Sequence, residues 1–277
     1  MKKILVPVDF SKHSEYALEV AANIAKKHNA TINVLHMMGL AESFLTKDQT
    51  NEVFNGMYFM KLAKLKFSEF LNKDYLEGVT ITQTIRNYKV FREVNDVAKE
   101  FGAELIVMGS HGTTGFQDVF IGSNTQKVIR TSETPVLIVK DRMKDFKLKK
   151  GVFLTDFDLN SIGAFKEAQI IFEQLGAKLK LLFINLPEKF MSTVEIHKKA
   201  EIFREEANLD KGSFDKMLEL YNDYSLERGA FNYCKELKAD IIGVATHGRK
   251  GLGHFFYGST GEDVANHSSI PVLTFKI

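Results

Sequence analysis

Apolar and polar positions along the first half of the chain predict strands that alternate with helices. The continuous apolar run Ile4–Val8 is typical of a strand buried on both faces. The next segment carries an apolar stripe at helical spacing, made of Ala17, Val20, Ala21, Ile24 and Ala25. Further strands are expected at Thr31–Met37, Val79–Arg86, Leu105–Met108 and Pro135–Lys140, and further helices within Ala41–Leu71, over Val90–Phe101 and around Val128. This alternation predicts a parallel sheet covered on both faces.

The second half of the chain repeats this plan. Strands are expected at Val152–Thr155, Leu179–Ile184, Ile241–Val244 and Val272–Phe275. A helical stripe follows the first of them, made of Ala164, Phe165, Ala168, Ile171, Phe172 and Leu175. Asp156 matches Asp9 at an offset of 147, whereas later matches have an offset of 136, so the second half is shorter in its middle. The predicted fold class is therefore α/β, with two doubly wound, flavodoxin/Rossmann-like domains, each on a five-stranded parallel sheet.

A glycine-spaced segment occurs in both halves, at Met108–Lys140 and at Val244–Lys276. Its glycines keep register at the offset of 136, which indicates two copies of one module. We place the two domains at residues 1–142 and 143–277. The mostly charged segment Asp141–Lys150 is expected to be an exposed linker.

The glycines of the first copy predict an anion-binding loop. Gly109 follows a buried strand and lacks a Cβ, so a ligand can approach the backbone closely. Gly122 and Ser123 open the last helix, where N–H groups and the helix dipole favour an anion. In a doubly wound sheet the ligand crevice lies at the carboxyl ends of the strands, where Asp9 and Met37 also fall. Asp9 would pair with ribose hydroxyls there, and the backbone at Met37 would contact an adenine edge.

The same residues also have interpretations that need no ligand. Ser123-x-x-Gln126 and Ser259-x-x-Glu262 have the spacing of capping boxes. A lone acidic residue at a strand end, such as Asp9, is often a turn residue. Both alternatives remain open at this point, although all the candidate groups fall on one edge of one sheet.

Composition and charge narrow the function classes. The net charge is only +2, which gives no case for nucleic-acid binding. A single cysteine, Cys234, excludes an intrachain disulfide and favours a reducing compartment. The N-terminal apolar run ends at Asp9, too soon for a leader peptide or a membrane span. We therefore expect a cytoplasmic protein with no membrane partner.

Neither a metal site nor catalytic residues are predicted. The eight histidines include no H-E-x-x-H or H-x-H arrangement. The sequence also has no Walker A motif, nucleophile elbow or Ser-His-Asp signature. The apolar residues of Phe54–Phe70 are assigned to the core or a subunit contact, with a partner-binding surface as the alternative.

Taken together, these motifs resemble those of a tandem universal stress protein, in which two copies of that domain are fused. The first domain carries the resemblance in LVPVDFS at Leu5–Ser11, in the spacing G-x2-G-x9-G-S that begins at Gly109, and in the closing PVLIVK. The second domain carries it in FLTDFD, THGRKGLGHFFYGS and PVLTFK. The resemblance covers nearly the whole chain outside the linker and the second-helix regions.

The resemblance implies an adenine nucleotide as ligand, because the glycine motif is similar to that of the family members that bind ATP. The implied cofactor is ATP, with or without Mg²⁺. The implied adenosine contacts are Pro7, Val8, Asp9 and Met37. The implied loop residues are Met108, Gly109, His111 and Gly112, and the implied phosphate contacts are Gly122, Ser123, Asn124 and Thr125.

The second copy departs from this pattern. Ala245 stands at the first glycine, and Leu154 and Thr155 replace the proline and its apolar neighbour, while Asp156 keeps the acidic position. Arg249 and Lys250 add positive charge in what is either a phosphate-binding or a solvated loop. A second, doubtful site would use Thr155, Asp156, Ile184, Val244, Ala245, His247, Gly248, Gly258, Ser259 and Thr260.

The resulting hypothesis is a regulatory protein of the stress response that binds ATP, mainly in its first domain, with no catalytic residues assigned. One alternative is a slow ATPase or autophosphorylating enzyme, and another is a nucleotide-free scaffold that acts through an unknown protein partner. Family members dimerise through their fifth strands. The resemblance therefore implies that Val136–Val139 and Val272–Phe275 pair within one chain as a pseudo-twofold, with a homodimer as a further arrangement.

Overall fold

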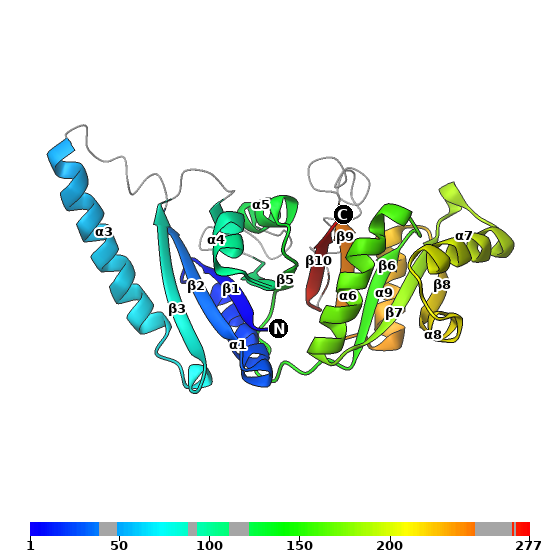
Figure 1. Cartoon of the computed structure of the whole chain (residues 1–277), viewed down its shortest axis with the longest axis horizontal. Helices are drawn as coiled ribbons and strands as arrows, with labels where there is room; N and C mark the ends of the chain where they lie inside the picture. The colour runs from blue at the N-terminus through cyan, green and yellow to red at the C-terminus, as the bar shows by residue number, and fades with distance from the viewer. Residues whose placement is uncertain (39–48, 88–92, 111–121, 247–267, 269) are drawn as a thin grey trace. The chain divides into compact units, whose positions relative to one another are not determined.

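The computed structural model divides the chain into two compact units, of which the first extends to Phe146 and the second begins at Lys147. It describes residues 1–38, 49–87, 93–110, 122–246, 268 and 270–277 (Figure 1). Within each unit, parallel strands alternate with helices along the chain. The predicted fold class of two doubly wound α/β domains is therefore confirmed.

The first unit has the strand order β3-β2-β1-β4-β5. Its strands are β1 (Lys3–Val8), β2 (Thr31–Met38), β3 (Thr80–Asn87), β4 (Leu105–Gly109) and β5 (Val136–Val139). Its helices are α1 (Lys12–His28), α3 (Gln49–Phe70), α4 (Glu93–Phe101) and α5 (Ser123–Thr131), with a short 3₁₀ turn η1 (Asp74–Leu76). The strand order reverses direction between β1 and β4, which makes the carboxyl ends of these two strands the switch point of the sheet.

Local signals set the ends of α1, as the sequence predicts. The Ser11 hydroxyl accepts a hydrogen bond from the Ser14 N–H at 3.2 Å, and Asn29 ends the helix in the left-handed conformation. The Lys73 ammonium that follows α3 pairs with Glu15 of α1 at 2.8 Å, so these helices share one face of the sheet. On the other face, Asn95 of α4 donates to the carbonyl of Thr131 in α5.

The second unit has the strand order β8-β7-β6-β9-β10. Its strands are β6 (Lys150–Thr155), β7 (Lys178–Asn185), β8 (Leu218–Asn222), β9 (Ile241–Thr246) and β10 (Val272–Lys276). Its helices are α6 (Ile162–Leu175), α7 (Thr193–Glu206), α8 (Lys211–Met217) and α9 (Leu226–Leu237), with 3₁₀ turns η2 (Leu159–Ser161) and η3 (Pro187–Lys189). Gly176 ends α6 in the left-handed conformation, which glycine adopts without steric cost.

The second unit is shorter in its middle, as the changing offset predicts. Residues 186–217 lie between β7 and β8, whereas residues 39–79 lie between β2 and β3. Strand β8 itself was not predicted. Its sequence LELYN lies at the edge of the sheet with three half-buried, two exposed and no buried positions, so it lacks the apolar run that marks the inner strands.

The segment that follows β5 is mostly exposed, as predicted, but Arg142 attaches it to α1. Its guanidinium donates from Nε to Glu19 Oε2 at 2.8 Å and from Nη2 to Glu19 Oε1 at 3.3 Å. The Glu19 side chain is only 6% exposed, so this two-point contact satisfies a carboxylate that the fold otherwise buries. The side-chain amide of Asn23 adds a longer bond to the carbonyl of Lys144, at 3.4 Å.

We expect Arg142→Gln to speed trypsin cleavage after Lys144 and Lys147, because the segment loses its attachment to α1. Limited proteolysis of the folded chain should show cleavage roughly fivefold faster, the change that a small loss of local stability produces. Glu19→Gln should give a similar acceleration, whereas Glu205→Gln in the second unit should give none. Equal cleavage rates in all three variants would contradict the attachment.

Candidate functional site

The carboxyl ends of β1, β2 and β4 lie at one edge of the first sheet. Val8, the last residue of β1, pairs with His36 of β2, and Met37 follows directly. The register of β1 against β4 runs from Ile4 opposite Leu105, which brings Gly109 to the same edge. The structure therefore brings together Asp9, Met37 and Gly109 at the switch point, where a doubly wound sheet offers its ligand crevice.

The carboxylate of Asp9 is held in a tight turn at this edge. Its Oδ1 accepts a hydrogen bond from the Ser11 N–H at 3.1 Å. Asp156 makes the equivalent contact in the second unit, where its Oδ1 accepts from the Asp158 N–H at 3.0 Å. Each side chain thus has the local contact of a turn-forming aspartate. That contact also fixes the direction of the carboxylate relative to the strand end.

Gly109 lacks a side chain for a reason other than the predicted one. A Cβ at this position would lie 2.6 Å from the carbonyl carbon of His13 and 2.7 Å from its oxygen. The first turn of α1 therefore occupies the space that was assigned to a ligand. In the second unit the same position is Ala245, which is 8% exposed and is accommodated where α6 begins only at Ile162.

The amino end of α5 lies against the end of β4. The Gly122 N–H donates to the carbonyl of Ser110 at 2.7 Å, and the Thr125 hydroxyl donates to the carbonyl of Gly109 at 2.9 Å. Gly122 is the N-cap residue, and no side chain of the described residues caps the helix there. The capping-box interpretation of Ser123 is therefore wrong, because Ser123 is the first helical residue rather than the cap.

The residues predicted to contact phosphate differ in burial: two are exposed and Thr125 is buried. Ser123 and Asn124 are exposed in the first turn of α5, where backbone N–H groups lack helical acceptors. Thr125 is buried, and its hydroxyl donates to the carbonyl of Gly109. This side chain therefore joins α5 to β4, and only the backbone N–H of Thr125 is left for a phosphate contact.

Some predicted residues lie outside the described part of the chain: His111, Gly112, His247, Gly248, Gly258, Ser259 and Thr260. Of the second site, Val244 and Ala245 are buried in β9, and the Thr155 hydroxyl accepts from the Phe157 N–H at 2.9 Å. The side chain of Ile184 packs against α9, since a Cβ at Gly229 would lie 2.8 Å from its Cγ2. The Ile184 side chain is therefore part of the packed core of the second unit.

Sequence analysis missed the residue that follows each strand-end aspartate. Phe10 and Phe157 both have a positive φ, of 63° and 58°. An aromatic side chain in the left-handed region costs about 1–2 kcal/mol, so surrounding contacts must hold it there. The available signal was the Asp-Phe pair that recurs at the offset of 147.

Lys140 is a second residue that the sequence analysis did not assign to this edge. It directly follows β5, whose last residue Val139 pairs with Gly109. Burial lowers the pKa of the Lys140 ammonium to about 8, and the neighbouring Asp141 carboxylate opposes part of that shift. An anion bound close to this ammonium would favour its charged form.

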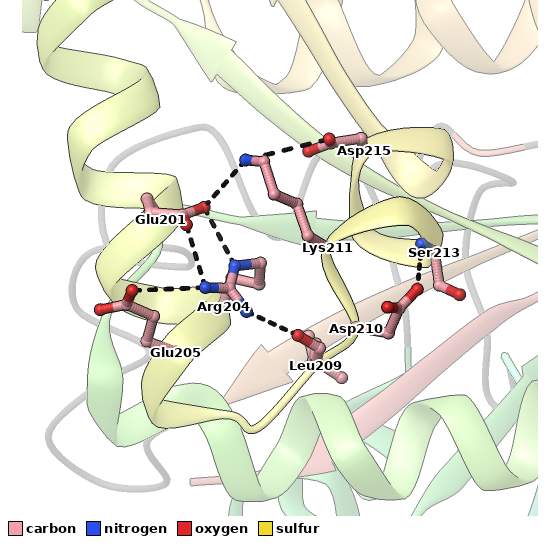
Figure 2. A network of polar contacts seen from close by, with 8 residues as sticks. All are labelled: Glu201, Arg204, Glu205, Leu209, Asp210, Lys211, Ser213 and Asp215. Atoms are coloured by element: carbon pink, nitrogen blue, oxygen red, sulfur yellow. Dashed lines mark hydrogen bonds and ion pairs between the residues drawn. The ribbon is translucent and has the colours of Figure 1, made fainter.

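A cavity of about 480 Å³ lies in the second unit, between α7 and α8. Figure 2 shows the polar network beside it, centred on Arg204. Arg204 donates to Glu201 from Nε at 3.0 Å and from Nη2 at 2.9 Å, and to the carbonyl of Leu209 at 2.7 Å. The hydrogen bond from Arg204 lowers the pKa of the Glu201 carboxyl. The bond to Leu209 fixes α7 to the segment that leads into α8. We therefore assign this network to the stability of the fold and not to ligand binding.

Comparisons with known proteins agree with this architecture. The universal stress protein family profile matches residues 1–140 and again residues 148–276. The chain therefore belongs to the universal stress protein family and contains two such domains in tandem.

Some relatives match one half of this chain, and others match its whole length. Universal stress protein YxiE of Bacillus subtilis is 34% identical over 146 residues, which cover 50% of this chain and 98% of the relative. Universal stress protein Slr1230 of Synechocystis is 24% identical over 298 residues and covers both chains completely. The crystal structure of a universal stress protein from Archaeoglobus fulgidus has the same fold, with a TM-score of 0.65 at 19% identity over 99% of this chain and 96% of that one.

The part of the chain that the structure describes lacks two further features. No helix there is long and apolar enough to cross a membrane. Those residues also contain no group of three or more histidine, cysteine, aspartate or glutamate side chains that could hold a metal ion.

We expect Gly109→Ala and Gly163→Ala to change stability in opposite directions. A Cβ at Gly109 meets the backbone of His13, and such overpacking typically costs about 1–3 kcal/mol. A Cβ at Gly163 in α6 meets nothing within 4 Å, so alanine there should add up to about 1 kcal/mol of helix stability. Urea unfolding followed by circular dichroism measures both, and a stable Gly109→Ala variant would contradict the close packing of α1 on β4.

Proposed function

We propose that the chain is a stress-response protein that binds ATP at the carboxyl edge of its first sheet. The observation that carries this proposal is the amino end of α5, which the Gly122 and Thr125 bonds hold against β4 while no described side chain caps it. A helix terminus that begins at a glycine, at the switch point of a doubly wound sheet, provides N–H donors and a positive dipole end for phosphate.

The other groups at this edge fit the remaining parts of the nucleotide. Asp9 presents a carboxylate, which accepts hydrogen bonds from ribose hydroxyls. Met37 lies in β2, one position beyond the last residue that pairs with β1, and its backbone supplies polar groups for the adenine edge. The half-buried ammonium of Lys140 adds a positive charge on the β5 side. The resemblance of the glycine motif to ATP-binding family members supports the same assignment.

The second unit is the weaker candidate. It keeps the turn made by Asp156, but its glycine motif departs at Ala245 from the motif that resembles the ATP-binding family members. We propose that bound ATP acts as a regulatory ligand, because a nucleotide held at the amino end of α5 alters a surface that a protein partner contacts. Cytoplasmic localisation and pairing through the fifth strands, within one chain or as a homodimer, stay predictions.

ATP with Mg²⁺ should raise the stability of the purified chain, and Asp9→Asn should weaken that effect. At a ligand concentration of 100 times Kd the gain is about 2.7 kcal/mol. Loss of the carboxylate should raise Kd by at least about tenfold, the effect of one charged hydrogen bond. Thermal melting and isothermal titration calorimetry measure both quantities.

The matched control for this test is Asp156→Asn, which changes the equivalent turn of the second unit and should leave the dominant binding event intact. A wild-type chain that shows neither a melting shift nor binding heat would contradict ATP binding. Phosphate release in the same samples separates the alternatives. Turnover that Asp9→Asn or Ser123→Ala abolishes would favour the slow ATPase instead.

A further inference from the structure

The backbone at Phe10 is unusual among the described residues. Five non-glycine residues there have a positive φ, and three of them, Asn29, Asn208 and Lys238, lie at the ends of helices. Phe10 and Phe157 instead follow strand ends, each directly after the aspartate of the turn. Residues held in sparsely populated backbone conformations concentrate at functional sites, so this pair requires an explanation.

The ring of Phe10 is held on two sides. Its centroid lies 4.4 Å from that of His36 in β2, and 5.2 Å and 5.4 Å from those of Phe67 and Phe70 in α3. The His36 ring is itself fixed, because its Nδ1 lies 2.9 Å from the carbonyl oxygen of Val8. Both aromatic contacts with α3 are edge-on, the geometry that aromatic pairs favour.

The second unit repeats this arrangement with different partners. The Phe157 ring is 2% exposed and stacks on Phe183 at 5.2 Å, with Phe203 of α7 at 5.9 Å. Phe183 matches His36 at the offset of 147, and α7 occupies the chain position of α3. An aromatic clamp on a left-handed phenylalanine is thus present in both copies, while the residues that form it have changed.

The clamped phenylalanine lies inside the turn that holds the aspartate carboxylate. Phe10, with its left-handed backbone, stands between Asp9 and Ser11, whose N–H donates to Asp9 Oδ1. Without the ring contacts, Phe10 would relax to a negative φ, because a side chain with a Cβ is strained in the left-handed region. That rotation would move the Ser11 N–H, the donor that orients the Asp9 carboxylate at the strand end.

We propose that Phe10 is a positioning residue for nucleotide recognition: its ring, clamped by His36, Phe67 and Phe70, holds the turn that presents the Asp9 carboxylate to the ribose hydroxyls. This inference rests on the proposed binding of ATP by the first unit. It adds that discrimination between ribose and deoxyribose depends on a side chain that does not touch the nucleotide. It also links α3 to the site, because two of the three ring partners lie on that helix.

The test compares ATP with 2′-deoxy-ATP and 3′-deoxy-ATP by isothermal titration calorimetry. The wild-type chain should prefer ATP over at least one deoxy form by about tenfold, the effect of one hydrogen bond to a charged group. Phe10→Ala should reduce that preference to about twofold, and so should Asp9→Asn. The Asp9→Asn, Phe10→Ala double variant should discriminate no less than Asp9→Asn alone, because both changes act through one carboxylate.

Three further variants separate positioning from stability. Phe10→Tyr keeps the ring and should retain the wild-type preference, and Phe157→Ala is the matched control in the second unit. If Phe10→Ala does not fold, Phe67→Leu loosens the clamp from α3 and should reduce the preference in the same direction. Circular dichroism of each variant establishes that the folded state is being compared.

The outcomes distinguish the two proposals. A wild-type chain that binds no nucleotide overturns both of them. A wild-type chain that discriminates between ATP and the deoxy forms, with variants Phe10→Ala and Phe67→Leu that are less stable but discriminate equally well, overturns only the positioning role. Loss of discrimination in Phe157→Ala also overturns it, because that change lies in the other unit.

Discussion

The first turn of α1 crosses β4 at Gly109 so closely that no Cβ fits between them. This contact places the start of α1, directly after the turn formed by Asp9, Phe10 and Ser11, against the end of β4. The carbonyl of Gly109 accepts the Thr125 hydroxyl, which holds the amino end of α5 at the same edge. The turn and the amino end of α5 therefore meet at the strand end on which α1 packs.

The two units share one fold but differ in the residues at the carboxyl edge of the sheet. Each has a five-stranded parallel sheet, a strand-end aspartate in a turn and a left-handed phenylalanine after it. In the second unit α6 begins only after a 3₁₀ turn, and Ala245 is accommodated where the first unit requires glycine. The first turn of the helix after the aspartate therefore differs between the units, in the region where Gly109 of the first unit contacts His13.

Much of the fold could be predicted because its signals are local. Buried strands appear as apolar runs, and Ser11, Asn29 and Gly176 mark helix ends through contacts within a few residues. Strand β8 escaped prediction because an edge strand with half its side chains exposed has no such run. The second-helix region was predicted as the place where the two halves differ in length, since the offset changes there.

The site was less predictable, because its geometry depends on contacts between distant residues. The sequence indicates that Gly109 needs its small size, but not that His13 is the reason. It likewise cannot show that Gly122 is the cap of α5, or that the Thr125 hydroxyl bonds to Gly109. The Asp-Phe pair was visible twice, yet its meaning required the backbone angles and the aromatic clamp.

Hydrogen exchange with and without ATP and Mg²⁺ tests the central claim most directly, because it locates the ligand on the chain. The account predicts slower exchange at two segments of the first unit, the turn at Asp9–Ser11 and the amino end of α5 from Gly122 to Gln126, with smaller changes in the second unit. Unchanged exchange at both segments, in a chain that calorimetry shows to bind ATP, would contradict the proposed site.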